Sequence, residues 1–391
     1  MRVDCTPIAN DRPERAVVAL FDEGMTVVPA PRRRMPRAMT VGIWSLTVAL
    51  FSLLALTVLP TTFVIQQPGP VFNTLGTVKT SAGEEVPLIS VDGAQTYPTK
   101  GALDLLTVQV AGSRERTSSW FELALAWFDP AKAVLPIDDV FPKGQSTEER
   151  NQESAVMMVD SQKEATAAAL IHLGYDVKAM VRVYGLTDDS AAQGILQKDD
   201  IIRAANGTPI TETDQLRAVI NQGAGAPVEL EIERDGKTLT DTVTPKSATT
   251  DGKTTWLIGV TTLHDYDFPI DVTIQLDNVG GPSAGMMFAL GIVDTLSPGE
   301  LNGGEQVAGT GTIDAAGEVG PIGGIRQKMF GAVGAGAHWF LAPASNCDEV
   351  VGHVPAGLRV FSVSTLDQAI TVLDTIRTGG DLDALPTCTA P

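Results

Sequence analysis

A run of 19 residues without a charged side chain, Val41–Leu59, constrains this chain more than any other feature. An α-helix needs about 20 predominantly apolar residues to cross a bilayer. Four arginines lie between residues 32 and 37, and no basic residue follows the run closely. Positive charge of this kind stays on the cytosolic side of a membrane helix. The sequence therefore predicts a single-pass cell-membrane protein, with a disordered cytosolic tail at 1–38, a transmembrane helix at 39–65 and an extracytoplasmic remainder.

A cleaved signal peptide is the alternative interpretation of this run. Such a peptide has a shorter apolar core and an A-x-A-like cleavage site, whereas the sequence PTTFV follows the apolar run here. The uncleaved anchor places Cys5 in the cytosol and both Cys347 and Cys388 outside it. Disulfides persist outside the cytosol, so a Cys347–Cys388 disulfide is possible.

The net charge of the 391-residue chain, −19, argues against nucleic acid as a partner, because phosphate binding needs clustered lysine and arginine. Residues 1–40 carry +2, so the remainder carries −21. The length allows two or three domains. The four histidines and three cysteines show no metal-ligand spacing, and we expect neither a metal nor a cofactor.

The stretch 178–250 has a pattern of its own. An extended run at 180–184 leads to the segment SAAQGILQKDDIIRAANGTPI, a short helix at 213–221 and two alternating strands joined by Asp235-Gly236. This order resembles a PDZ domain in its bacterial arrangement. PDZ domains bind extended peptides by adding a strand to a sheet edge, so the resemblance implies protein or peptide partners.

Ser283 stands in a run of small residues, GGPSAG, directly before an apolar helix-like run at 286–293. About 45 residues later comes PIGGIRQK, which ends in Lys328. A serine becomes a nucleophile when a neighbouring base takes its proton, and a buried lysine can be that base. Burial lowers the pKa of lysine from about 10.4. Strand and helix patterns alternate around both motifs, which predicts an α+β fold.

The region from Gly280 to Pro343 resembles the proteolytic domain of Lon-type (S16) serine proteases. The matching pieces are Gly281-Pro282-Ser283-Ala284-Gly285, Gly309-Thr310-Gly311, Pro321-Ile322-Gly323-Gly324-Ile325-x-x-Lys328, and the strand that ends at Pro343. With the membrane anchor and the PDZ domain, the arrangement is similar to membrane-anchored YlbL-like bacterial proteases. The resemblance implies that Ser283 is the nucleophile, Lys328 the general base and Thr310 a support for the lysine.

The resemblance also implies a domain plan in which the PDZ domain is inserted into the protease domain. The first part of the protease domain, with its linker, then covers 66–177, the PDZ domain 178–250, the catalytic part 260–376 and a tail 377–391. Lon-type domains often form rings, so a hexamer is an expectation from the resemblance. The expected function is a membrane-anchored serine endopeptidase that cleaves extracytoplasmic proteins.

Two features depart from ATP-dependent Lon enzymes. The carboxylate three residues before their serine is replaced here by Gly280, with Asp277 and Asn278 further back. No ATPase module is present, because the two GKT strings at 236–238 and 252–254 lack the upstream glycine of a P-loop. We therefore expect proteolysis that is independent of ATP.

Three alternatives remain open at this point. Gly281–Gly285 also fits the G-x-S-x-G elbow of an α/β-hydrolase esterase, with Asp314 or Asp348 and His353 as nominal partners. Ser283 could instead be a helix N-cap and Lys328 a solvated surface lysine. The third alternative is a catalytically silent PDZ scaffold on a protease fold.

Overall fold

The computed structural model describes residues 37–80, 83–141, 144, 146–250, 253–277 and 279–389. The tail predicted at 1–38 lies outside these residues except for its last two. Helix α1, Arg37–Val58, is the one helix in the described part that is long and apolar enough to cross a membrane, judged by length and composition. It ends short of the predicted bound at residue 65, since Pro60 cannot donate a helical hydrogen bond and strand β1 begins at Phe63.

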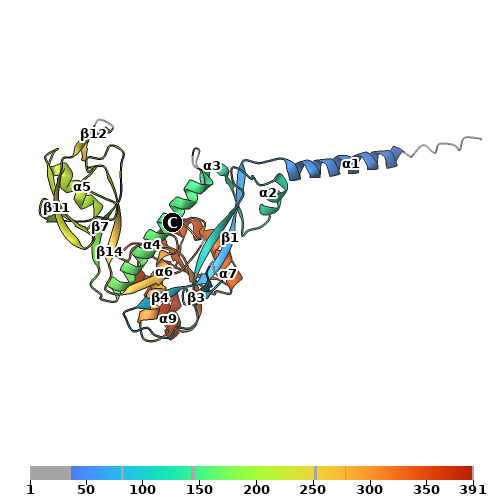
Figure 1. The fold of residues 1–391 in the computed structure, drawn as a ribbon. Helices are drawn as coiled ribbons and strands as arrows, with labels where there is room; N and C mark the ends of the chain where they lie inside the picture. The colour runs from blue at the N-terminus through green and yellow to red at the C-terminus, as the bar shows by residue number, and fades with distance from the viewer. Residues whose placement is uncertain are drawn as a thin grey trace, which may run out of the picture. The chain divides into compact units, whose positions relative to one another are not determined.

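A six-stranded sheet of order β20-β19-β16-β5-β1-β6 forms the centre of the protease region (Figure 1). Its strands are β1 Phe63–Asn73, β5 Ala102–Ala111, β6 Ala133–Pro136, β16 Gln306–Gly309, β19 Trp339–Pro343 and β20 Arg359–Val363. The four strands from β20 to β5 are parallel, while β1 runs antiparallel to both β5 and β6. The mixture of parallel and antiparallel pairs, with helices on the sheet, agrees with the predicted α+β class.

Helices cover both faces of this sheet. They are α2 Trp120–Ala126, α3 Ile137–Val140, α4 Thr147–His172, α6 Gly285–Leu296, α7 Ile325–Ala335, α8 Cys347–Val350 and α9 Leu366–Thr378. Successive residues of a strand point to opposite faces. Leu105 of β5 joins the core cluster formed with α4, α6 and α9, whereas its neighbour Leu106 joins the cluster formed with α7. The sheet is therefore the middle of three layers.

Helix α4 is longer than the sequence pattern predicts. The pattern indicated a helix at 164–173, but the helix begins at Thr147 behind a capping box in which Ser146 and Glu149 satisfy each other's backbone N–H groups. Its first half is polar and carries little apolar periodicity, which is why the prediction missed it. The predicted stop is correct, because Gly174 follows the helix with a φ of 83° that favours glycine.

A second sheet, of order β11-β10-β8-β7-β14, builds the PDZ region around its own core of Val183, Leu216 and Leu230. Its elements are β7 Lys178–Leu186, β8 Ile201–Ala205, β9 Thr208–Pro209, α5 Thr213–Gln222, β10 Val228–Arg234, β11 Lys237–Val243 and β14 Val260–Asp267. The predicted turn at Asp235-Gly236 joins β10 to β11. Strand β14 falls in the range expected for the catalytic part, 260–376, yet it pairs with β7 of the PDZ sheet.

Short strand pairs and turns complete the fold. They are β2 Thr77–Lys79 with β3 Glu85–Pro87, β4 Ile89–Asp92 with β15 Asp271–Ile274, β12 Lys246–Thr250 with β13 Lys253–Leu257, β17 Thr312–Ile313 with β18 Val319–Gly320, and the 3-10 helices η1 Ala344–Asn346 and η2 Leu382–Ala384. Cys347 and Cys388 are joined by a disulfide, so the region expected as a tail is tied to the protease region.

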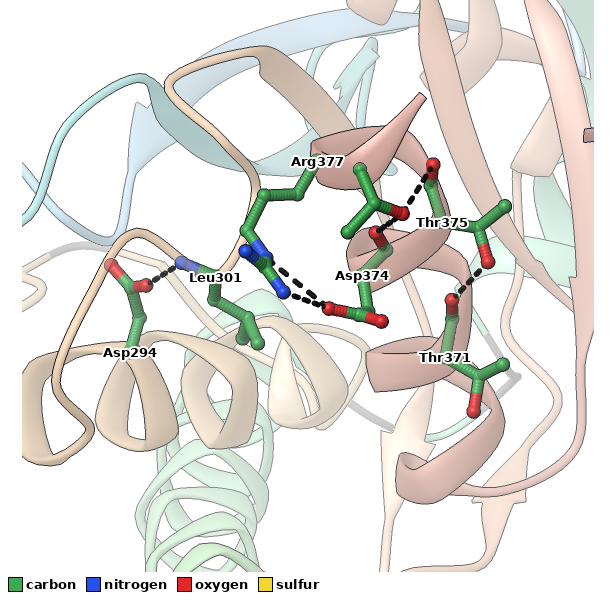
Figure 2. A network of polar contacts seen from close by, with 7 residues as sticks. Asp294, Leu301, Thr371, Asp374, Thr375 and Arg377 are labelled. Atoms are coloured by element: carbon green, nitrogen blue, oxygen red, sulfur yellow. Dashed lines mark hydrogen bonds and ion pairs between the residues drawn. The ribbon is translucent and has the colours of Figure 1, made fainter. Parts of the chain in front are cut away.

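Two helices pack together where α6 ends (Figure 2). Asp294, in the last turn of α6, accepts a hydrogen bond of 2.6 Å from the backbone N–H of Leu301. On α9, Arg377 forms an ion pair with Asp374. Asp294 is completely buried, although carboxylates are almost always exposed or paired.

Candidate active site

Ser283 lies in the turn that leads into α6, and glycine makes that turn possible. Gly281 has a φ of 87°, in the left-handed region that side chains other than glycine rarely adopt. The backbone N–H of Gly311 donates to the carbonyl of Ser283 over 3.0 Å, and the N–H of Met286 donates to the carbonyl of Gly311 over 3.0 Å. The turn is therefore fixed against the Gly309–Gly311 segment, the second of the predicted motifs.

Lys328 reaches this serine from α7, on the other face of the sheet. Its Nζ lies 2.7 Å from Ser283 Oγ and 2.8 Å from Thr310 Oγ1, and donates to both. Thr310 Oγ1 in turn donates to the carbonyl oxygen of Ser283 over 2.9 Å. The three residues that the sequence singled out therefore form one hydrogen-bonded cluster.

The lysine of this cluster is buried. The Lys328 side chain is 1% exposed, and none of the ion pairs found in the described part of the chain includes it. Burial disfavours the charged ammonium and lowers the pKa of Lys328 to about 7. A large fraction of the amine is thus neutral near pH 7, as a general base requires.

Two contacts fix the start of α7: a close approach of Gly324 to β5 and a pair of hydrogen bonds from Asn346. The sequence analysis identified neither. Gly324 has a φ of 71°, and a Cβ there would lie 2.8 Å from Val108 of β5. The side chain of Asn346 accepts from the N–H of Ile322 and donates to its carbonyl, both over 2.9 Å, while it is 3% exposed. The PIGG segment is thereby held against β5 and η1, and this fixes the direction from which Lys328 enters the site.

Helix α4 supports the serine turn from the opposite side. The N–H of Gly281 donates to the carbonyl of Ser154 over 2.8 Å, and Ser161 Oγ donates to the carbonyl of Pro282 over 3.0 Å. The approach is close, because a Cβ on Gly280 would lie 2.8 Å from Ser154 Cβ. Glycine at position 280, where ATP-dependent Lon enzymes are expected to have a carboxylate, therefore makes room for α4.

An open cleft of about 590 Å³ leads to the hydroxyl of Ser283. Strands β1 and β5 line one side and the serine turn lines the other, with Asp277 at the rim. Strand β1 has an irregularity between Pro68 and Val71, within the part that faces the cleft. A cleft bordered by strands suits an extended chain.

The nominal partners for an α/β-hydrolase triad lie elsewhere. His353 is exposed and its Nδ1 contacts the carbonyl of Val351, and Asp314 accepts from the N–H of Glu318. Neither His353, Asp314 nor Asp348 lines the cleft of Ser283. The geometry gives the esterase interpretation no support.

The PDZ region contains a second concave site, a groove of about 720 Å³ between α5 and β14. Strand β14 is an edge strand that pairs with β7 on one side only. In the two-residue loop before it, the carbonyls of Ile258 and Gly259 point inward, where they accept from the N–H groups of Ala192 and Thr187. The hydroxyls of Thr213 and Thr262 lie 2.9 Å apart across the groove.

The sequence analysis did not find this groove, although a signal was present. The run Leu257-Ile258-Gly259-Val260 places a glycine among apolar residues directly before a strand. Gly259 has a φ of 74°, and a Cβ there would lie 2.6 Å from Ser190 Cα. Only a glycine allows this loop to pass so close to the domain core.

Comparison with known proteins assigns a domain class to the region of Ser283 and to the region of the second sheet. Residues 260–375 match the Lon protease (S16) C-terminal proteolytic domain, and residues 144–244 match the PDZ domain. The chain therefore combines a Lon-type proteolytic domain with a PDZ domain, and the resemblance to these two domain classes is confirmed.

Individual relatives cover only part of this chain. Lon protease 1 of Sorangium cellulosum is 40% identical over 23% of this chain and 11% of its own length. Lon protease of Geobacter metallireducens is 32% identical over 28% of this chain and 14% of its own length. This chain thus spans a small fraction of these curated relatives. Among solved structures, the PDZ domain of the SdrC-like protein from Listeria monocytogenes is 22% identical, with 21% of this chain and 85% of that chain covered and a TM-score of 0.19.

Proposed function

We propose that this chain is a membrane-anchored, ATP-independent serine endopeptidase that cleaves extracytoplasmic proteins with a Ser283–Lys328 dyad. The observation that carries the proposal is the 2.7 Å contact between Ser283 Oγ and the buried Nζ of Lys328, within a domain of the Lon proteolytic class. α1 would be the anchor, and the arginines at 32–37 favour a cytosolic N-terminus.

Each group of the cluster has a chemical role in this proposal. The neutral amine of Lys328 takes the proton of Ser283 as the hydroxyl oxygen attacks the peptide carbonyl. The protonated amine then gives that proton to the leaving amine of the substrate. Water next attacks the acyl-enzyme: Lys328 takes a proton from the water, the bond between the acyl group and Ser283 Oγ breaks, and the lysine returns the proton to Ser283. Thr310 keeps the lysine directed at Ser283. The positive end of the α6 helix dipole lies next to Ser283 and is suited to stabilise the oxyanion.

The PDZ groove would select substrates or a regulator. An extended peptide can add a strand to the free edge of β14, with its side chains directed toward α5. The proposed reaction includes no ATP-driven unfolding, so its substrates would be unfolded, short or brought by this groove.

Two measurements on the full chain in detergent test the dyad. The first is cleavage of casein and of short extended peptides by Ser283→Ala, Lys328→Ala and a matched control, Lys178→Ala, whose side chain is exposed. We expect the first two variants to lose at least about 10³-fold in kcat/KM and the control to keep its rate. The second is labelling by a fluorophosphonate, with the modified residue located by mass spectrometry.

The rival function, a silent PDZ scaffold, makes the opposite prediction. It requires that Ser283 is not labelled and that all three variants bind peptides as the parent does without cleavage. Modification of Ser283 in the parent, but not in Lys328→Ala, would exclude the scaffold.

The expected hexamer is a separate proposal that rests on the class alone. Sedimentation of the full chain in detergent or nanodiscs tests it, and a monomer at all concentrations would contradict it.

A further inference from the structure

Helix α2 and the two residues that follow it expose a group of large apolar side chains, most of them aromatic. Five large apolar side chains in and just after the helix are exposed: Trp120 by 38%, Phe121 by 40%, Leu125 by 57%, Trp127 by 65% and Phe128 by 88%. We call these five residues the α2 face. Isolated apolar residues on a surface are ordinary, but a contiguous aromatic group marks an interaction surface.

The helix that carries this face is firmly held on its inner side. Leu123 and Ala126 are buried, and they pack against Ile65 of β1. A capping box at Ser119 and Glu122 fixes the first turn. The exposed face is therefore a fixed feature of the fold rather than a mobile segment.

The α2 face lies beside the point where the chain leaves α1. Pro60, two residues after the last residue of α1, forms a β-bridge with Ser119, the N-cap of α2. The buried hydroxyl of Thr61 donates to the carbonyl of Ser118 over 2.8 Å. Two residues of chain span at most about 7 Å, and the paired residues of an antiparallel bridge lie about 5 Å apart. The start of α2 thus stays within about 12 Å of the end of α1, whatever direction α1 takes.

The nearby carboxylates have partners within the protein. Glu122 accepts from the N–H of Ser119 over 2.7 Å, and Asp129 forms an ion pair with Lys132. Tryptophan is enriched where proteins meet the interface of a bilayer, because its ring is apolar and its N–H is polar. Aromatic and leucine side chains are also what interfacial helices insert into that layer.

We propose that the α2 face docks on the outer surface of the lipid bilayer that α1 crosses. This inference rests on the proposed anchoring but not on the proposed catalysis. It has a consequence for the cleft, since β1 continues from this point and lines the cleft from Gln66 onward. Six strand residues span roughly 20 Å. Docking would hold the near end of the cleft, at Gln66, about that far from the membrane, which favours substrates whose cleavable segment is close to the bilayer.

Fluorescence quenching in vesicles tests the docking. Full-length variants are prepared in which Trp339 and one further tryptophan remain, either Trp44 in α1, Trp127 in the α2 face or Trp256 in the PDZ region, with phenylalanine at the other positions. Each is reconstituted in phosphatidylcholine vesicles with or without bromine on the acyl chains near the headgroup. We expect the emission of Trp44 and of Trp127 to fall by about half, and that of Trp256 to stay unchanged.

The outcomes separate the docking from the anchor. Quenching of Trp44 without Trp127 would overturn the docking and keep the anchor. Quenching of Trp127 without Trp44 would overturn the anchor and, with it, docking on a bilayer that α1 crosses, and quenching of neither would overturn both. If Trp127 responds to protein density in the vesicles but not to bromine, a second copy covers the face and the docking is wrong.

A second set of variants checks that the whole face takes part. In the chain that keeps Trp127, Phe121→Ser with Leu125→Ser removes apolar contact without touching the buried side of α2. We expect quenching of Trp127 to fall at least twofold. Leu239→Ser, at an exposed leucine of β11, is the matched control and should leave quenching unchanged. Equal quenching in all three chains would overturn the proposal.

Discussion

The carboxylate of Glu164 in α4 joins the PDZ sheet to the active-site region through Tyr266. The phenol of Tyr266, near the end of β14, donates to one oxygen of Glu164 over 2.6 Å. The other oxygen accepts from the N–H of Ala315 over 2.7 Å, in the turn that follows β17. Nearby, Asp265 forms ion pairs with both Lys163 of α4 and Arg182 of β7. The strand that borders the peptide groove and the helix that supports the serine turn are therefore in direct contact.

This contact predicts coupling between peptide binding and cleavage. A strand added to β14 would stiffen it and tighten the contact with Glu164. We expect a peptide selected for binding to the parent chain to raise kcat about fivefold, which corresponds to a coupling of about 1 kcal/mol. Tyr266→Phe should remove most of that increase. Tyr184→Phe, at an exposed tyrosine of β7, is the matched control and should keep it. An increase of equal size in Tyr266→Phe would show that this hydrogen bond transmits nothing.

The pH profile follows from the burial of Lys328. Its lowered pKa of about 7 means that the neutral amine predominates above that pH and the ammonium below it. For a general base, kcat/KM should therefore rise with pH, reach half its maximum near pH 7 and then level off. Lys328→Arg should be inactive at every pH, because a guanidinium stays protonated. A profile that falls as pH rises through 7 would contradict the assignment of Lys328 as the base.

Thr310 should affect both the rate and the pH profile. Thr310→Val keeps the shape but removes the hydroxyl that accepts from Lys328 and donates to the carbonyl of Ser283. We expect kcat to fall roughly 10- to 100-fold, as for a lost positioning contact. The midpoint of the profile should also move to lower pH, since an acceptor that favours the ammonium is gone. Thr310→Ser restores the hydroxyl and should recover both. A loss of rate with no recovery in the serine variant would indicate a packing role only.

Ser161 provides a test of the support from α4. Ser161→Ala removes the hydrogen bond to the carbonyl of Pro282, next to the proposed nucleophile. We expect kcat to fall about 10-fold while KM stays constant, because the turn loses its position and the cleft is unchanged. Ser154→Ala is the matched control on the same helix, since Ser154 contacts Gly281 through its backbone carbonyl. If kcat is equal in the two variants, the hydroxyl of Ser161 does not position the serine turn.

These contacts show how far the sequence alone could lead. The motifs around Ser283 and Lys328 are local and contiguous, so resemblance paired the two residues, and their reactive atoms do lie 2.7 Å apart. The apolar run at 286–293 likewise predicted a helix, which is α6. The contact between Ser161 and Pro282 joins positions 121 apart and involves a backbone carbonyl, so no residue pattern records it. The polar first half of α4 also lacks the periodicity that reveals a packed helix.

Asp294 predicts how stability depends on pH. Burial raises its pKa to about 6 from an ordinary 3.8, against the opposing hydrogen bond from Leu301 (Figure 2), and its Oδ2 has no partner among the described residues. Between those two pH values the folded chain binds more protons than the unfolded chain. The free energy of unfolding therefore falls as pH rises from about 4 to about 6, by up to about 3 kcal/mol, and stays low above.

Asp294→Asn should abolish this fall, because the amide keeps an acceptor for Leu301 and does not ionise. Urea denaturation at pH 4.5 and at pH 7.5 measures the difference for each chain. We expect the variant to gain stability relative to the parent at the higher pH, while the gain shrinks or reverses at the lower pH. Asp374→Asn, on α9, is the matched control, since the side chain of Asp374 is 55% exposed and its pairing with Arg377 is solvated (Figure 2). If the parent and Asp294→Asn respond to pH in parallel, the carboxyl of Asp294 is not the group that titrates.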